Sequence, residues 1–219
     1  MNAIAVLQWA RGTGLQVAIV IFLVGVVIRL VEMWMVGRKP DLAEPRAGGG
    51  LGGWRTVFSR SVPAPGMMKN AALVIIGGYI FHLGFFITLL LFSPHIVFFQ
   101  NMLGLSWPAL SNGVIEVTAI LSIGALIALG VQRFLNPVRR FLSTFQDWLV
   151  WLVTLLPLLS GYLLLHNPMF TYTTMLALHI LSVELLLVIF PFTKLMHAFT
   201  FIVSRWYTGA MAARKGVVA

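Results

Sequence analysis

The segment HILSVELLLVIFPFTKLMH, which runs from His179 to His197, is almost wholly apolar and has a histidine at each end. On one continuous helix the two histidines are five full turns apart, so both imidazoles leave the same face about 27 Å from each other. That distance is close to the thickness of the hydrocarbon core of a bilayer. The segment therefore predicts a membrane-spanning helix with an ionisable side chain near each membrane surface.

The composition of the whole chain agrees with this interpretation. Of the 219 residues, 59% are hydrophobic and only 10% are charged, whereas about a quarter of the residues of a soluble domain are charged. We therefore expect an integral membrane protein. The chain contains no cysteine, which excludes disulfides, thiolate-bound metal sites and clusters, and covalently attached haem on this chain. Histidine is then the strongest ligand it offers to a metal or a haem.

Five hydrophobic stretches are long enough to cross a bilayer. They cover residues 14–35, 71–92, 113–131, 148–165 and 173–203. The last is long for one crossing, so we expect its final turns to extend beyond the lipid. The sequence predicts an all-α fold in which residues 1–219 form a single domain, an integral membrane five-helix bundle.

The charged residues of the chain, which has a net charge of +9, are distributed unevenly among the connections. The connections 96–112 and 166–172 have no charged residue, while the other two connections and the C-terminal tail are basic. The positive-inside rule places the basic segments in the cytoplasm, the N-terminus outside, and the chain in the cell (inner) membrane. Because the positive charge lies between spans and not on a soluble module, we expect no binding to nucleic acid.

The basic segment 36–70 contains the glycine-rich run RAGGGLGG and the proline-rich run SVPAPG. At this density of glycine and proline we expect no structured domain. Two interpretations remain open. The segment either binds a cytoplasmic partner or anionic lipid, or it is a linker whose charges only fix the topology. Its positive residues are Arg38, Lys39, Arg46, Arg55, Arg60 and Lys69.

Ionisable residues within membrane spans are costly and are often functional. His82 is in the second span, which runs outward, and His179 and His197 are in the fifth, which runs inward. Antiparallel helices pair their residues in crossed order, so His82 should face His197 on the cytoplasmic half. His179 then needs a partner near the outer end of the second span, where His95 is the candidate.

Two neutral imidazoles on facing helices can hold one haem iron axially, so the two pairs predict two b-type haems. On a straight helix His95 would point about 140° away from His82, and Pro94 is expected to correct its direction. His166 is the rival outer ligand. Each histidine could instead be a hydrogen-bonded contact between helices. Small residues near these positions could leave room for a flat macrocycle: Gly77, Gly78 and Gly84.

Four charged residues within the spans are further candidates. Glu184 and Glu116 could carry protons for a quinone, although a helix-contact hydrogen bond is the competing role for Glu184. Arg29 and Glu32 are three residues apart, a spacing that favours an ion pair near the cytoplasmic side. Contact with a haem propionate is the alternative for this pair.

The sequence LHILSVELLLVIFPFTKLMHAFT resembles the corresponding helix of the respiratory nitrate reductase gamma subunit family. That helix has a histidine, an apolar run and the element Phe-Pro-Phe-x-[Arg/Lys]-Leu-x-His, and FHLGFF resembles the family's Phe-His-x-Gly stretch. The resemblance implies five spans, with His82 and His197 as ligands of the haem b nearer the cytoplasm and His179 as one ligand of the outer haem b. One departure matters, because the family's fourth histidine corresponds here to Phe92. The SPH sequence that ends at His95 resembles instead the membrane cytochromes of sulfite-reductase-associated and heterodisulfide-reductase-like complexes.

We therefore expect the electron-transfer subunit of a respiratory oxidoreductase complex. It would pass electrons between membrane quinol or quinone and a cytoplasmic iron–sulfur partner subunit, where the terminal substrate is converted. We place the quinol near the outer haem, beneath the connection 96–112 and its polar residues Gln100, Asn101, Ser111 and Asn112. The alternatives are a proton-relaying transporter and a membrane anchor subunit without a cofactor.

Overall fold

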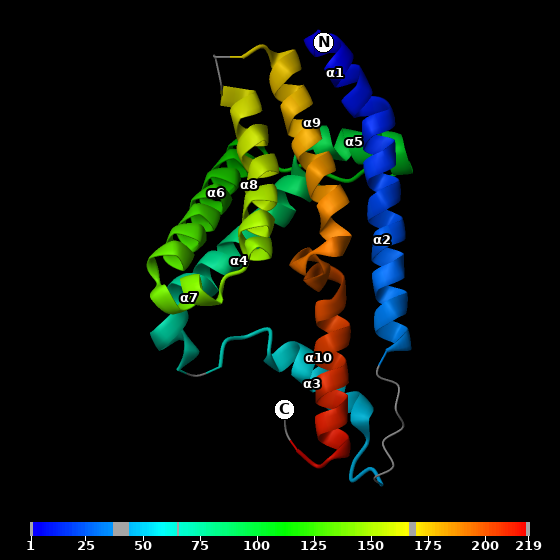
Figure 1. Cartoon of the computed structure of the whole chain (residues 1–219), viewed down its shortest axis with the longest axis vertical. Coiled ribbons are helices and arrows are strands. Elements are labelled where there is room, and N and C mark those ends of the chain that lie inside the picture. Colours follow the sequence, from blue (N-terminus) through cyan, green and yellow to red (C-terminus); the bar gives the residue numbers. More distant parts are fainter. Residues whose placement is uncertain (1, 37–43, 65, 167–169, 218–219) are drawn as a thin grey trace. The chain divides into compact units, whose positions relative to one another are not determined.

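A computed structural model describes residues 2–36, 44–64, 66–166 and 170–217 (Figure 1). All the regular elements in these ranges are helices. Five helical segments are long and apolar enough to cross a membrane: Ala3–Met35, Met67–Leu91, Asn112–Leu135, Phe145–His166 and Tyr172–Phe192. The five predicted spans are therefore confirmed, and the chain is an all-helical, multi-pass membrane protein.

The chain divides into two compact units. The first unit comprises Met1–Ile19 and Ala71–Val188, and the second comprises Val20–Asn70 and Ile189–Ala219. The first span consists of α1 (Ala3–Trp9), the π-helical turn η1 (Ala10–Gly14) and α2 (Leu15–Met35). It contributes to both units, because the boundary between Ile19 and Val20 falls within α2.

The core of the first unit lies between α6 (Asn112–Leu135) and α8 (Phe145–His166). Leu126 of α6 packs against Leu155 and Leu158 of α8. Gly130 lets the helices approach, because a methyl group there would lie 2.5 Å from the Trp151 ring. The indole N–H of Trp151 donates to the Leu126 carbonyl at 2.8 Å, so the same side chain satisfies its polar group while filling the core.

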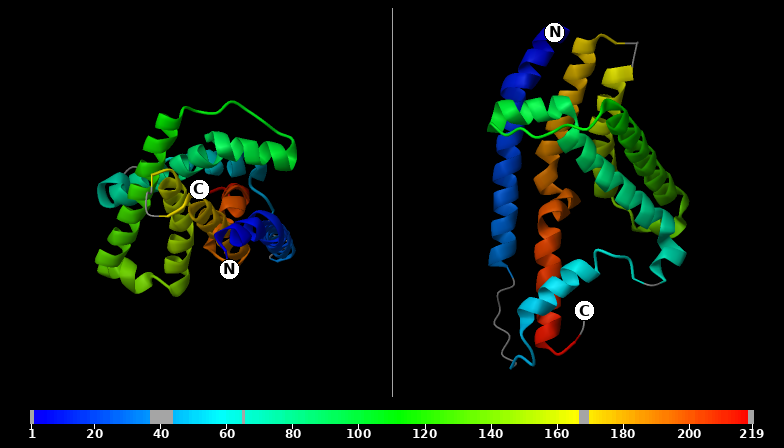
Figure 2. Two further views of the ribbon diagram at one scale, coloured as in Figure 1. Left: turned by 90° about the horizontal axis from the view of Figure 1, so that it is seen from above. Right: turned by 180° about the vertical axis from the view of Figure 1, so that it is seen from behind.

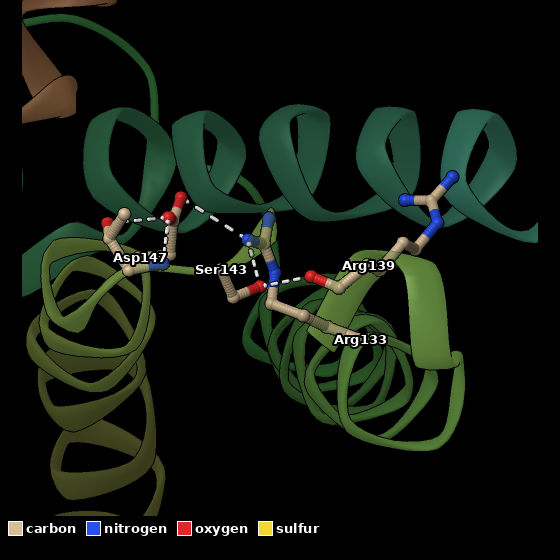
Figure 3. Close-up of polar contacts among 5 residues, drawn as sticks. Arg133, Arg139, Ser143 and Asp147 are labelled. Atoms are coloured by element: carbon tan, nitrogen blue, oxygen red, sulfur yellow. Dashed lines mark hydrogen bonds and ion pairs between the residues drawn. The ribbon is translucent and has the colours of Figure 1, made fainter. Parts of the chain in front are cut away.

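The connection from α6 to α8 is held by a polar cluster around α7 (Pro137–Leu142), drawn in Figure 3. Arg133 pairs with Asp147 at 3.2 Å and donates to the Ser143 hydroxyl at 3.1 Å. The Ser143 hydroxyl in turn donates to the Arg139 carbonyl at 2.7 Å. Arg133, one of the charges that predicted the topology, therefore also stabilises this corner of the first unit.

In the first unit, α4 (Met67–Leu91) is followed by a second, shorter helix, α5 (Ser93–Leu103). The helices are separated by Phe92, whose backbone is extended, and Pro94 lies in the first turn of α5, where its missing N–H is tolerated. Much of the predicted connection 96–112 is therefore helical. The α9 helix (Tyr172–Ile189) lies beside α8 in the same unit (Figure 1).

The predicted continuous helix over residues 173–203 is wrong. After α9 the chain forms two 3₁₀ turns, η2 (Phe190–Phe192) and η3 (Lys194–Met196), before α10 (His197–Arg214) begins. The cause is Pro191, which lacks a backbone donor, followed by the extended residue Thr193. His179 and His197 therefore do not share one face of a straight five-turn helix.

In the second unit the η2 turn packs against α2. A methyl group on Gly25 would lie 2.5 Å from the Pro191 ring, and the Arg29 side chain donates to the Pro191 carbonyl at 3.1 Å. Arg29 also pairs with Glu32 at 2.9 Å, which confirms the predicted ion pair.

The sequence predicts no structured domain in the basic segment 36–70, but part of the segment is helical. Its glycine-rich run lies in and just before the helix α3 (Gly49–Ser59), which packs along α10 (Figures 1 and 2). Glycine lowers helix propensity, but here it allows two backbones to approach closely. Arg38 and Lys39 lie outside the described residues.

Candidate functional site

Two of the predicted ligands, His95 and His179, lie together in the first unit. Their ring centroids are 6.1 Å apart and their planes differ by 13°. His95 follows the break between α4 and α5, and its Nδ1–H donates to the Thr88 carbonyl at 2.9 Å. A carbonyl can only accept a hydrogen bond, so this contact fixes the tautomer and puts the lone pair of His95 on Nε2.

The ring of His179 is positioned by two residues of α8 that the sequence analysis did not identify. Its Nδ1 lies 3.1 Å from the hydroxyl of Ser160. That hydroxyl donates its hydrogen to the Leu156 carbonyl at 2.7 Å, so it accepts from the Nδ1–H of His179, and Nε2 carries the lone pair. The neighbouring Gly161 leaves room for the ring, because a methyl group there would lie 3.1 Å from Cε1 of His179.

The centroid distance of this pair is close to that of two imidazoles which ligate one iron axially, an arrangement in which both Nε2 lone pairs would point at the iron in the planes of their rings. Iron at about 2 Å from each ligating nitrogen sets the ring centroids roughly 6 Å apart. Burial lowers the pKa of His95, so the ring is neutral at pH 7, the form that binds a metal. Within the described part of the chain, no group of three or more metal-binding side chains occurs. A haem needs only two from the protein, because its macrocycle supplies the other four.

The remaining two predicted ligands belong to different units. His82 is on α4 of the first unit, and its Nδ1–H donates to the Gly78 carbonyl at 2.7 Å. His197 is the first residue of α10 in the second unit, and its Nδ1–H donates to the Lys194 carbonyl at 2.8 Å. Each contact selects the tautomer that His95 has, with the lone pair on Nε2. The pairing of His82 with His197 stays a prediction.

The rival outer ligand, His166, has a different environment. Its Nδ1 lies 3.0 Å from the Tyr162 carbonyl, and its Nε2 lies 2.9 Å from the Glu116 carboxylate. Both ring nitrogens are thus engaged by groups of the first unit. The structure brings His95, and not His166, next to His179.

Two of the three glycines predicted to make room for a macrocycle serve helix packing instead. A methyl group on Gly84 would overlap the hydroxyl of Ser122 on α6, and one on Gly77 would lie 3.3 Å from Leu129. Only Gly78 of the three has no neighbour within 4 Å of the position its Cβ would take.

The carboxyl of Glu184 is buried between α9 and the η1 turn. The residue is 6% exposed, and its Oε1 has no hydrogen-bond partner among the described residues. A methyl group on Gly14 would lie 2.9 Å from this oxygen. The helix-contact hydrogen bond considered for Glu184 is therefore not made through Oε1.

The polar residues predicted near a quinol are exposed in the first unit. Gln100 and Asn101 lie on α5, and Asn112 begins α6. Ser111 is the N-cap residue of α6, but its side chain makes no capping hydrogen bond. A polar residue at a helix end can also serve as a cap, but the Ser111 side chain does not have this role.

Comparison with known proteins gives one relative. A protein of Nitratidesulfovibrio vulgaris (strain Hildenborough) is 35% identical over 138 residues, which make up 63% of this chain and 60% of the relative. The chain thus spans less than two thirds of the relative's length, and the relative's name, "Protein", specifies no activity. No protein-family model matches the chain, and no solved structure resembles it at a significant level.

Proposed function

We propose that this chain is a dihaem b membrane subunit of a respiratory oxidoreductase complex. The observation that carries the proposal is the near-parallel pair of His95 and His179, whose ring centroids are 6.1 Å apart. The tautomers that their hydrogen bonds select support ligation through Nε2. His82 and His197 are the proposed ligands of the second haem, on the cytoplasmic half.

The orientation in this proposal follows from the basic segments. Lys and Arg near the ends of spans favour the cytoplasmic side, and they occur between the first two spans, between the third and fourth, and after Arg205. The N-terminus is then outside and the C-terminus is in the cytoplasm. The pair His95–His179 lies toward the outer surface, and the α6–α7–α8 corner faces the cytoplasm.

The chemistry of the proposed site is one-electron transfer, which bound haem b supplies. The protein holds the iron and tunes it. The Thr88 carbonyl and the Ser160 hydroxyl orient the two imidazoles and make them more basic, while the surrounding spans exclude water. Electrons pass between membrane quinol or quinone and an iron–sulfur subunit in the cytoplasm, where the terminal substrate is converted.

The quinol in this proposal binds on the outer half, beside His179 and beneath α5. Oxidation of a quinol releases two protons with its two electrons, so the site needs a proton acceptor. The pair Glu116–His166, with 2.9 Å between carboxylate and imidazole, offers one at the ends of α6 and α8 that the proposal places outside. Glu184, on another face of α9, is the second candidate.

The test is the optical spectrum of the purified protein. Reduced-minus-oxidised difference bands of haem b and two haems per polypeptide in a pyridine haemochrome assay are expected. One haem per chain would show that one of the two proposed pairs of histidines does not bind haem. The absence of haem bands would contradict the proposal.

The buried carboxyl of Glu184 favours one alternative, a transporter that relays protons through membrane-embedded acids and histidines. Such a protein would have no haem bands, and Glu184→Gln would abolish proton uptake by reconstituted vesicles. The same spectrum therefore separates the two functions, and it also separates the first from a membrane anchor without a cofactor.

A further inference from the structure

Helix α3 has two non-polar faces, and α10 covers only one of them. The covered face is built from small residues, and methyl groups there would collide with α10. On Gly53 a methyl would lie 2.6 Å from the Trp206 ring, and on Gly52 it would overlap Ala213. Thr56 is buried at the same contact, against Gly209. Such close packing fixes α3 on α10 without large side chains on the covered face of α3.

The opposite face of α3 carries its large apolar side chains, all exposed. Leu51 is 87% exposed, Trp54 52% and Phe58 70%. Positions i, i+3 and i+7 of a helix lie on one side, and the rings of Trp54 and Phe58 are neighbours with centroids 6.4 Å apart. We call these three residues the outer face of α3. Exposed apolar patches of this kind mark binding surfaces for protein or lipid.

The direction of α3 decides between protein and lipid. Arg205 of α10 donates to the Ser61 hydroxyl at 3.0 Å, just after α3 ends. At the other end, the amide of Arg46 donates to the Arg214 carbonyl at 2.8 Å. The two helices are therefore antiparallel, and the start of α3 lies beside the end of α10.

In the proposed orientation we place the lipid boundary between Phe192, where the fifth membrane-spanning segment ends, and Arg205. The first turns of α10 expose the apolar residues Phe199, Phe201 and Ile202, and Arg205 is the first Lys or Arg of the helix. From that boundary α3 leads away from the bilayer along α10. Leu51 is ten residues before Ser61, which is about 15 Å on a helix. A helix at the membrane interface lies flat, and its apolar face is buried by only about 5–10 Å. A helix that leads about 15 Å away from the boundary therefore cannot place its whole outer face in the lipid.

The helix α3 and the segments beside it are positively charged. The Lys and Arg residues of α3, of the preceding segment and of the end of α10 are Arg46, Arg55, Arg60, Arg205, Arg214 and Lys215. Among the described residues from 44 to 61 the acidic side chain is Glu44. A partner that covers the outer face needs an apolar centre and acidic groups around it.

We propose that the outer face of α3 binds the cytoplasmic iron–sulfur subunit, through a surface of that subunit that is apolar at its centre and acidic at its rim. This rests on the proposed function, which supplies the orientation and the partner. It assigns the docking site to three residues of one helix. Trp54 and Phe58 are large aromatic residues, a class that contributes strongly to the binding energy of protein interfaces. The contacts with α10 hold α3 in position.

The test compares complexes purified from the membranes of the native host in mild detergent, through a tag on this chain. The double variant Trp54→Ala/Phe58→Ala and the single variant Leu51→Arg change side chains that do not pack on α10. Haem, non-haem iron and acid-labile sulfide are measured for each preparation. Non-haem iron and sulfide per haem should fall at least tenfold in both variants, while haem per chain stays at the wild-type value. The matched control is Phe141→Ala on α7 of the first unit, an aromatic residue that is 87% exposed, which should retain the partner.

Unchanged iron and sulfide in both variants would overturn the proposal, and so would a wild-type chain that purifies with haem but without stoichiometric iron–sulfur protein. Failure of the proposed function looks different, because haem bands would then be missing from the wild type. A second measurement addresses lipid as the occupant. Since the chain has no cysteine, Leu51→Cys can carry a single fluorophore in vesicles of phosphatidylglycerol and phosphatidylethanolamine. A water-soluble quencher should reach it, whereas quenching by a lipid-embedded nitroxide would show that the outer face binds the bilayer.

Discussion

The Nε2 atom of His166 lies 2.9 Å from the carboxylate of Glu116, while the ring of His95 lies parallel to that of His179. The two candidates for the outer haem therefore differ in what they face. An imidazole engaged by a carboxylate would have to break that contact to bind iron. His95 needs no such change.

Replacement of His95, but not of His166, should remove the outer haem. His95→Ala removes an axial ligand and should lower the haem content from two to one per chain. His166→Ala should leave two, because it removes only a partner of Glu116. The measurement is the pyridine haemochrome assay on both purified variants. Loss of a haem in His166→Ala with full retention in His95→Ala would show that the outer ligand is His166.

The sequence predicts the number of spans because each is a long apolar run bounded by charged or turn-forming residues. The sequence does not predict that the fifth hydrophobic stretch is interrupted at Pro191, because the residues on both sides of this break in the helix are hydrophobic. It also gives no signal for the helix α3, because propensity counts glycine against a helix, and the stabilising contact comes from α10, far away in the chain.

For the candidate site, the sequence identifies the histidines from their polarity within apolar spans. It cannot identify Ser160 and Gly161, because serine and glycine are common at any contact between membrane helices. Their role depends on the register of α8 against α9, which places one hydroxyl and one missing side chain at the ring of His179. The turn that brings His95 to the same place is set by Phe92 and Pro94.

The space beside His179 can be tested through Gly161. A Cβ at this position would lie 3.1 Å from Cε1 and 3.3 Å from Nδ1 of the imidazole. Gly161→Val should displace the ring and lower occupancy of the outer haem severalfold, with the inner haem unchanged. Gly124→Val is the control, because a Cβ on Gly124 meets no atom within 4 Å. Equal haem contents in both variants would exclude a steric role for Gly161.

The hydroxyl of Ser160 should tune the outer haem. It accepts the Nδ1–H of His179 and so makes that imidazole a stronger donor, which favours ferric iron. In Ser160→Ala the reduction potential of the outer haem should become more positive. A potentiometric titration measures it. The control Ser182→Ala removes a hydroxyl that donates to the backbone carbonyl of His179 at 2.7 Å, so its effect should be smaller. A larger shift in the control would contradict the assigned hydrogen bond.

The crossed pairing of the inner ligands predicts that two single variants lose the same haem. His82→Ala and His197→Ala should each abolish the same haem and leave the other, since iron that loses one axial ligand is weakly held. The two variants should therefore give the same spectrum and the same remaining midpoint potential. If they retain different haems, His82 and His197 do not share an iron.

The position of the quinol site gives the last prediction. Quinol is apolar and reaches the protein through the lipid, so its site needs an opening toward the bilayer with a few polar groups. In the proposed orientation the outer half offers Gln100 and Asn101 on α5 and the pair Glu116–His166, whereas the inner connections are basic and would face the proposed partner. A quinol-analogue inhibitor should therefore shift the spectrum or potential of the haem that His95→Ala abolishes, and leave the other haem unchanged. Glu116→Gln should slow electron transfer from quinol more than electron transfer from a soluble reductant, because only the quinol must lose protons. An inhibitor that perturbs only the haem of His82 and His197 would instead place the site on the cytoplasmic half.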